Sequence, residues 1–359
     1  MSGQGAKIEY VDISKRYGAV EALRPTSLTI EAGEFFSIIG PSGSGKTTLL
    51  GVTAGYVPPT SGQIIIDGRN VVGEPPFQRN IGMVFQNYAL FPHMTVAENI
   101  GFPLRMRKTP RAEIAERVKK MLALVQLEEM ASRKPGQLSG GQQQRIALAR
   151  AAVYDPLMLL MDEPLSALDK NLREAMQDEV KQFQTVLGST VLYVTHDQAE
   201  AAAMSDRIAI MNHGRIVQIG SPRDLYEHPV ARFVASFLGE ANIFDIESVT
   251  PHASGSMIAT HHGFSLVCAA SGSHDGQCVC VRPEAVALSA SRPEHDNVLE
   301  GKVVDATYTA GSLRYRVELA PDCIITQRTP SVRGIEMFDT GATVFASWRA
   351  EDTLLVDDD

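Results

Sequence analysis

The residues Gly40 to Thr47 read Gly-Pro-Ser-Gly-Ser-Gly-Lys-Thr and fit the pattern G-x-x-x-x-G-K-[ST]. An apolar run, Phe35 to Ile39, precedes them, and Thr47 to Ala54 has the composition of the first turns of a helix. A strand, a glycine-rich loop and a helix in this order gather backbone N–H groups and a positive helix end around one point. We predict that the stretch binds a polyphosphate, with Lys46 at the β- and γ-phosphates and the Thr47 hydroxyl on Mg²⁺. The alternative is a chance glycine-rich turn, which the flanking strand and helix argue against.

The length and charge of the chain limit its architecture and its partners. Its 359 residues are enough for two domains, and a net charge of -9 argues against a nucleic-acid partner. No run approaches eighteen apolar residues, and the first ten residues contain no apolar signal core. We therefore expect a protein that is neither secreted nor membrane-spanning, whose contact with a membrane would be made through another subunit.

The four cysteines, Cys268, Cys278, Cys280 and Cys323, all lie in the last quarter of the chain. Cys278 and Cys280 could suggest a metal, but no histidine or second close pair stands at zinc spacing. We interpret them as alternate residues of one strand and expect all four to be reduced.

Acidic residues end one of the apolar runs. Leu157 to Met161 is continuous and apolar, as expected of a central parallel strand, and it is followed by Asp162 and Glu163. Beside a phosphate loop, the first carboxylate can hold the water shell of Mg²⁺, and the second can activate an attacking water. A solvated turn is the alternative.

Two other apolar runs also end in polar residues. Ile81 to Phe85 precedes Gln86, and Thr190 to Val194 precedes Thr195 and His196. In doubly wound sheets, ligands bind beyond the carboxyl ends of the strands, so both side chains have a suitable position. Either residue alone is as readily structural as functional.

The segment Leu138 to Gln142 begins a clear helix. Ser139 followed by two glycines forms an N-terminal cap with accessible N–H groups, which is a second potential anion site. Taken alone, the segment is only a capped helix. Residues 94 to about 150 are helical in character, and Arg111 to Leu127 has an amphipathic period.

Two features have open interpretations. Tyr17 could stack on an adenine ring, although a turn residue at a sheet margin is the commoner role. The apolar group Tyr88 to Met94 is either a docking surface for another protein or a local core.

The composition changes near Gly239. The stretch Pro222 to Leu238 appears helical, whereas residues 239–359 contain short strand patterns and frequent turns. We place a domain boundary there and predict an α/β domain followed by a small all-β module of the oligonucleotide/oligosaccharide-binding (OB) kind. The strands expected in the module are 243–249, 276–281, 298–309, 313–319, 323–326 and 343–348.

Together these motifs resemble the nucleotide-binding subunit of an ATP-binding-cassette (ABC) transporter. Leu138-Ser139-Gly140-Gly141-Gln142 matches the signature that separates this family from other phosphate-loop ATPases. It lies between the glutamine of the Q-loop, Gln86, and the Asp162-Glu163 pair, in the family's order. Residues 166–169 match the D-loop, and His196 matches the switch histidine. The resemblance covers residues 7–238.

The resemblance implies a fold and a site. It implies a phosphate-loop ATPase domain over residues 1–238, with a helical subdomain at about 87–155, and a β-rich TOBE-type regulatory domain over 239–359. Two copies would close head-to-tail over two molecules of ATP, with Mg²⁺. The implied catalytic residues are Glu163, His196, Gln86 and Lys46, and the implied metal ligands are Thr47, Gln86 and, through water, Asp162. The implied ATP contacts are Tyr17, Gly40, Pro41, Ser42, Gly43, Ser44, Gly45, Lys46, Thr47, Thr48, Gln86 and Asp162 from one copy, with Leu138, Ser139, Gly140, Gly141, Gln142 and Asp169 from the other.

The resemblance also implies partners and a place in the cell. The run from Gln78 to Lys108 looks most like spermidine/putrescine import ATPases, while importers of Fe(III) or 2-aminoethylphosphonate share most of it. The implied partners are two permease subunits, which would dock on residues 88–94, and, indirectly, a periplasmic solute-binding protein. The resemblance places the chain at the cytoplasmic face of the bacterial inner membrane. A soluble cassette ATPase outside transport is less favoured, because such chains usually carry two cassettes or a coiled-coil insertion. The signature counts against a small-molecule kinase.

Overall fold

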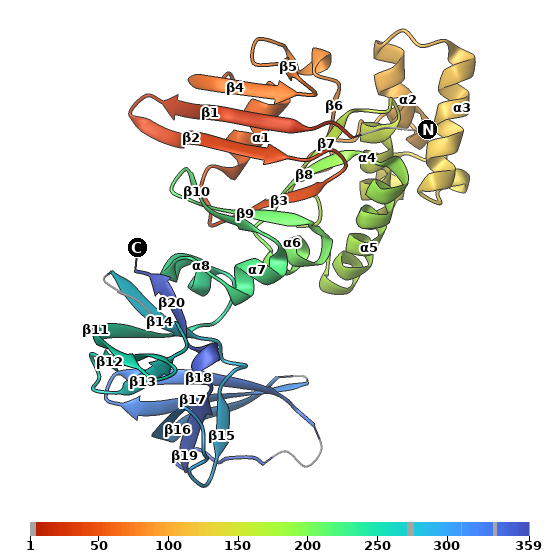
Figure 1. Cartoon of the computed structure of the whole chain (residues 1–359). Coiled ribbons are helices and arrows are strands. Elements are labelled where there is room, and N and C mark those ends of the chain that lie inside the picture. The colour runs from red at the N-terminus through yellow and green to blue at the C-terminus, as the bar shows by residue number, and fades with distance from the viewer. Residues whose placement is uncertain (1–4, 271–275, 310, 333–335, 359) are drawn as a thin grey trace. The chain divides into compact units, whose positions relative to one another are not determined.

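The computed structural model describes residues 5–270, 276–309, 311–332 and 336–358. The chain forms two compact units, Met1–Arg223 and Asp224–Asp359, which Figure 1 colours from red to green and from green to blue. The first unit contains two sheets and the larger helices. The second unit is built mainly of strands.

The central sheet of the first unit is mostly parallel and buried. Its order is β10 (Arg215–Gly220), β9 (Arg207–Asn212), β3 (Phe35–Ile39), β8 (Thr190–Val194), β7 (Met158–Asp162) and β6 (Ile81–Val84). Only β10 runs antiparallel to its neighbour. Because β3, β8 and β7 are neighbours, the residues that follow them emerge at one edge of the sheet. The predicted α/β class is confirmed.

A second, antiparallel sheet packs over the first helix. Its order is β2 (Val20–Ile30), β1 (Ile8–Tyr17), β4 (Ser61–Ile66) and β5 (Arg69–Asn70). Helix α1 (Lys46–Ala54) contributes Leu49 to a core shared with Ile8 of this sheet and Leu192 of the central sheet. The helix is therefore held from both sides along its length.

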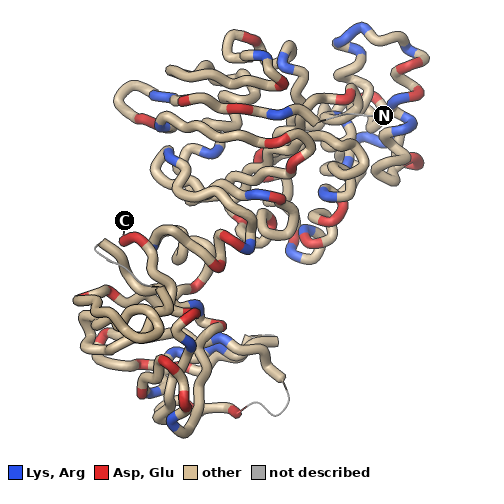
Figure 2. Tube along the Cα trace, in the orientation of Figure 1, with Lys and Arg blue, Asp and Glu red and all other residues tan. Residues whose placement is uncertain are grey.

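Three helices form the helical region of the first unit: α2 (Val96–Met106), α3 (Arg111–Leu124) and α4 (Gly140–Ala152). Short 3₁₀ turns at Pro76–Gln78, Glu128–Met130 and Pro135–Gln137 precede or join them. Helix α3 contains charged residues of both signs (Figure 2), including the i,i+4 pair Arg117–Glu113 at 2.9 Å. Helices α5 (Lys170–Leu187) and α6 (Gln198–Met204) complete the unit.

The second unit contains two antiparallel sheets and two short helices, α7 (Pro222–Glu227) and α8 (Arg232–Phe237). One sheet has the order β13 (Ser265–Cys268), β12 (Gly255–Thr260), β11 (Asn242–His252), β14 (Gln277–Val281) and β20 (Leu354–Asp357). The other has the order β15 (Ala287–Ser289), β19 (Thr343–Trp348), β16 (Asn297–Thr309), β17 (Ser312–Ala320) and β18 (Cys323–Pro330). The rings of Trp348 and Phe244 stack in the shared core, 6.2 Å apart. The all-β prediction for the tail is confirmed.

Some sequence expectations differ from these elements. The stretch Pro222 to Leu238 is helical, as expected, but it forms two helices, α7 and α8, because the chain breaks around Pro229. Both helices lie almost entirely in the second unit, whereas the change in composition falls later, near Gly239. Strands β12, β13, β15 and β20 had no sequence prediction. Within the described residues, no helix is both long and apolar enough to cross a membrane.

Candidate functional site

The glycine-rich loop joins β3 to α1, as the sequence predicted. Gly45 has φ +106°, and a Cβ there would lie 2.6 Å from the carbonyl oxygen of Ala22. Only glycine fits this position, so the backbone closes tightly around the start of α1. A cavity of about 270 Å³ opens here, lined by Ala22, Gly43, Ser44, Gly45, Lys46, Thr47 and Thr48.

Lys46 folds back over the loop. Its Nζ donates hydrogen bonds to the carbonyl oxygens of Gly40, at 2.7 Å, and Pro41, at 3.0 Å. Burial lowers the pKa of Lys46, while the nearby charges of Glu163 and Asp162 act in the opposite direction. An anion bound in the loop would stabilise the charged form of this buried amine.

A second polar group of the loop fits a phosphate. The Ser44 side chain is 2% exposed, and within the described part of the chain its Oγ has no hydrogen-bond partner. A buried hydroxyl without a partner is costly, and a phosphate oxygen would satisfy it. The loop therefore has the donors of a polyphosphate site.

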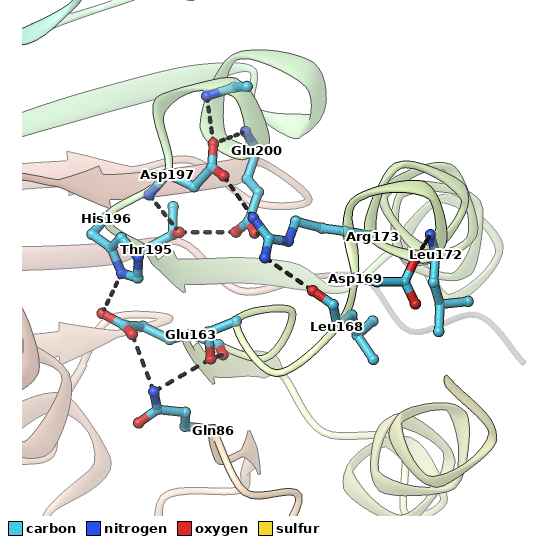
Figure 3. Close-up of polar contacts among 12 residues, drawn as sticks. Gln86, Glu163, Leu168, Asp169, Leu172, Arg173, Thr195, His196, Asp197 and Glu200 are labelled. Carbon is cyan, nitrogen blue, oxygen red and sulfur yellow. Dashed lines mark hydrogen bonds and ion pairs between the residues drawn. The ribbon is translucent and has the colours of Figure 1, made fainter. Parts of the chain in front are cut away.

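Glu163 lies at the centre of a polar cluster beyond the strand ends (Figure 3). Its Oε1 is 3.1 Å from Nδ1 of His196, and its Oε2 is 3.3 Å from Nε2 of Gln86. Gln86, Glu163 and His196 follow β6, β7 and β8, so the sheet brings together three residues that are far apart in the sequence. The backbone of Glu163 has φ +44°, a left-handed conformation that is uncommon outside glycine and typical of functional positions.

Asp162 is the last residue of β7. Burial raises the pKa of its carboxyl group, Glu163 raises it further, and Lys46 opposes the shift. A cation beside Asp162 would offset both unfavourable contributions. Together with the exposed Thr47 hydroxyl and the Gln86 amide, the site offers the hard oxygen donors that suit Mg²⁺.

The segment Leu138 to Gln142 caps α4, as predicted. Gln142 N donates to Ser139 Oγ at 3.3 Å, and Ser139 N donates to Gln142 Oε1 at 3.0 Å. This capping box uses hydrogen bonds within the segment. Gly140 and Gly141 follow at the helix start, which carries the positive end of the helix dipole.

Asp169 and Tyr17 occupy element ends. Asp169 caps α5, and its Oδ1 accepts a hydrogen bond from Leu172 N at 3.0 Å. Tyr17 ends β1 and is 49% exposed, with Lys15 Nζ 4.9 Å from the centre of its ring. About half of the Tyr17 side chain is therefore accessible, while the Lys15 amine lies over its ring.

The first residue of the apolar group Tyr88 to Met94 is buried. Tyr88 is 7% exposed and belongs to the core. Arg150 donates from Nη2 to the Tyr88 carbonyl at 2.7 Å and from Nη1 to the Ala89 carbonyl at 2.6 Å, which ties the loop down. The local-core alternative therefore holds for Tyr88, whereas Ala89, Pro92 and His93 are exposed, and the docking interpretation of these residues stays a prediction.

A different apolar group is exposed nearby. Phe77 is 75% exposed and Tyr56 is 56% exposed. They line a cavity of about 220 Å³ with Ala54, Pro76, Ile81, Met83, Arg107 and Tyr154. Phe77 was not predicted from the sequence, where a bulky apolar residue in a proline-containing loop was the available signal.

Comparison with known proteins agrees with this geometry. Residues 23–166 match the model of the ABC transporter family, and residues 279–356 match the TOBE domain. The spermidine/putrescine import ATP-binding protein of Thermobifida fusca is 46% identical over 352 residues, which is 96% of this chain and 91% of that protein. A protein of the same description from Pseudomonas aeruginosa is 47% identical, over 89% of each chain.

Solved structures give the same assignment for the first unit. The ATP-binding cassette MJ0796, a dimer bound to ADP and Pi after hydrolysis, is 35% identical and has a TM-score of 0.54. The alignment covers 60% of this chain and 99% of MJ0796. With a phosphate loop, a carboxylate cluster at the strand ends, the matched relatives and the appended TOBE domain, this chain belongs to the family of ATP-hydrolysing subunits of ABC transporters.

Proposed function

We propose that this chain hydrolyses Mg²⁺-ATP as a head-to-tail pair and thereby drives import of spermidine or putrescine through partner permeases. The convergence of Gln86 and His196 on Glu163 carries the proposal for hydrolysis. The names of the relatives support the solute, with Fe(III) or 2-aminoethylphosphonate as alternatives.

Glu163 is the general base in this proposal. Its carboxylate lies between Gln86 and His196, which can orient the attacking water and the γ-phosphate. Lys46 stabilises charge on the transferred phosphoryl group. Thr47, Gln86 and Asp162 would hold Mg²⁺, which would neutralise negative charge on the phosphates.

The second copy completes each site. Ser139 and the two glycines after it present N–H groups at the start of α4. In the proposed head-to-tail pair, these groups would lie near a phosphate that is bound in the loop of the other copy. Asp169 would approach from the same copy. The MJ0796 cassette, which is a dimer with ADP and Pi bound, supports this pairing.

The permease would dock at the cavity lined by Phe77 and Tyr56, which we call the Phe77 groove. Ala54 in its wall is the last residue of α1 and Tyr56 follows two residues later, while the other end of α1 carries Lys46. Buried Arg79 donates from Nη1 to the carbonyls of Val52, at 2.7 Å, and Thr53, at 2.9 Å, so it clamps this end of the helix. A helix from a membrane partner bound in the groove would thus contact the same rigid element as the nucleotide.

Reconstitution with candidate permease subunits and a candidate solute-binding protein tests the proposal. We expect ATP hydrolysis to be stimulated by the binding protein loaded with spermidine or putrescine and by neither Fe(III) nor 2-aminoethylphosphonate. Stimulation by one of those two solutes would reassign the substrate. Hydrolysis that no permease stimulates would favour a cassette ATPase outside transport.

A further inference from the structure

A polar network connects the segment Ser166–Asp169 with the turn that carries His196 (Figure 3). Its centre is Arg173, in the first turns of α5. The Arg173 side chain is 28% exposed, and its guanidinium group reaches three partners outside its own helix. None of these contacts is part of the proposed chemistry.

The first contacts of Arg173 join two loops. Its Nη2 donates to the carbonyl oxygen of Leu168 at 3.0 Å, and its Nη1 donates to Asp197 Oδ2 at 3.1 Å. Leu168 precedes Asp169 in the segment that would approach the partner copy, while Asp197 directly follows His196. One planar group therefore fixes the distance between the two loops.

Asp197 is in turn fixed to the backbone around it. Its Oδ1 caps α6 by accepting from the N–H groups of Ala199, at 2.9 Å, and Glu200, at 3.1 Å. Its own N–H donates to Thr195 Oγ1 at 3.0 Å. Thr195 and Asp197, the two chain neighbours of His196, are thus held by hydrogen bonds. The exposed His196 ring contacts Glu163.

Glu200 is the second acidic partner of Arg173 in the network. Its side chain is 2% exposed, and its Oε2 accepts from the hydroxyls of Tyr193 and Thr195, each at 2.8 Å. Its Oε1 lies 3.6 Å from Arg173 Nε, just beyond hydrogen-bonding distance. Two acidic groups therefore hold Arg173 close to the positive end of α5, where a cation is otherwise disfavoured.

We propose that Arg173 is a positioning residue that links residues 166–169 to the turn of His196, so that the histidine reaches its working position through Arg173 and Asp197. This inference rests on the proposed role of His196. It assigns no new group to the reacting atoms. It predicts that Arg173 and His196 act as one unit in turnover.

A double-mutant cycle on the full chain tests the link. Arg173→Lys keeps the charge but cannot reach Leu168 and Asp197 together. Asp197→Asn keeps a side chain that can cap α6 but removes the charge that Arg173 contacts. We expect each to lower kcat about 10- to 100-fold, with ATP affinity unchanged within about twofold.

In the His196→Ala background, we expect Arg173→Lys and Asp197→Asn to change kcat less than about twofold. Equal losses in both backgrounds would overturn the link while leaving the role of His196 intact. If His196→Ala alone hydrolyses ATP at the wild-type rate, the proposed function of His196 fails instead. If the melting temperature shows that either Arg173→Lys or Asp197→Asn is unfolded, the cycle is carried out with the other variant.

Lys181→Met is the matched control. Lys181 also lies on α5, and its Nζ is 3.0 Å from Oδ1 of Asp206, just after α6, so it joins the same two elements away from the His196 turn. We expect it to lower stability without lowering kcat more than about twofold. A loss in kcat as large as that of Arg173→Lys would show that any weakened contact between α5 and α6 has this effect, and would also overturn the proposal.

Discussion

Nδ1 of His196 lies 3.1 Å from Oε1 of Glu163, across the gap between the ends of two neighbouring parallel strands. The contact joins a 62% exposed ring to a carboxylate that is 24% exposed. Both side chains are thus reachable from solvent and held by each other. A γ-phosphate beside the pair would meet a base and a hydrogen-bonding group at once.

The first prediction concerns Glu163. Glu163→Gln retains the size of the side chain but removes the base, so we expect kcat to fall about 10²- to 10⁴-fold with ATP binding retained. Gel filtration with ATP should show a persistent dimer. The control Glu174→Gln alters an exposed carboxylate on α5 and should hydrolyse ATP normally. Wild-type turnover in Glu163→Gln would contradict the assignment.

Ser139→Arg tests the contribution of the second copy. The bulky cation would block the start of α4, so we expect hydrolysis to be lost while the isolated monomer binds ATP within about twofold of wild type. Thr95→Arg is a fair control, because Thr95 caps α2 with the same kind of capping box. Each change costs about 1 kcal/mol of stability through the lost cap. Weakened ATP binding by the Ser139→Arg monomer would argue against a site shared between copies.

The groove prediction uses Phe77. Because Phe77 is largely exposed, Phe77→Asp should change stability by less than about 0.5 kcal/mol and leave basal ATPase activity intact. Binding of permease subunits and stimulation of the ATPase should be lost. Val186→Asp alters another exposed apolar residue, on α5, and should leave both unchanged. Normal assembly with Phe77→Asp would place the permease elsewhere.

The cysteines provide a chemical test of the second unit. All four are buried, and burial raises their pKa values, that of Cys278 to about 12. Since the thiolate is the reactive form, a disulfide reagent at pH 8 should leave the native thiols unmodified and modify all four in denaturant. Fast reaction of a native thiol would mean that its sheet opens readily.

Glu200 predicts a pH dependence of stability. Burial is the largest cause of its raised pKa, so the folded state holds this proton more tightly than the unfolded state. Stability contributed by the protonated form is therefore lost as pH rises above the ordinary value of 4.5 towards the folded-state pKa. The free energy of unfolding of Glu200→Gln, relative to wild type, should increase over that range. A difference that stays constant with pH would contradict this.

Local patterns predicted the site better than they predicted its surroundings. The loop from Gly40 to Thr47 and the polar residues after β7 and β8 could be located, because each follows an uninterrupted apolar strand. The burial of Tyr88 could not be predicted, because it depends on Arg150, sixty-two residues away, whose guanidinium group satisfies the loop carbonyls. The role of Arg173 was also hidden, since its three partners come from two other segments.

The strands of the second unit show the same limit. Thr343 to Trp348 was predicted in full, because its apolar side chains alternate clearly. Ala287–Ser289 is a strand only because it pairs with β19, and its short sequence has no pattern of its own.

Helix α1 begins at Gly45 without a side-chain cap, and no substitution can supply one. A serine or aspartate stabilises the start of most helices, but a Cβ at this position would collide with Ala22. The start of α1, where the nucleotide would bind, therefore cannot be stabilised by adding an N-cap side chain. Amide hydrogens in the first turn of α1 should exchange quickly in the free chain and slowly once a phosphate takes the place of the missing cap.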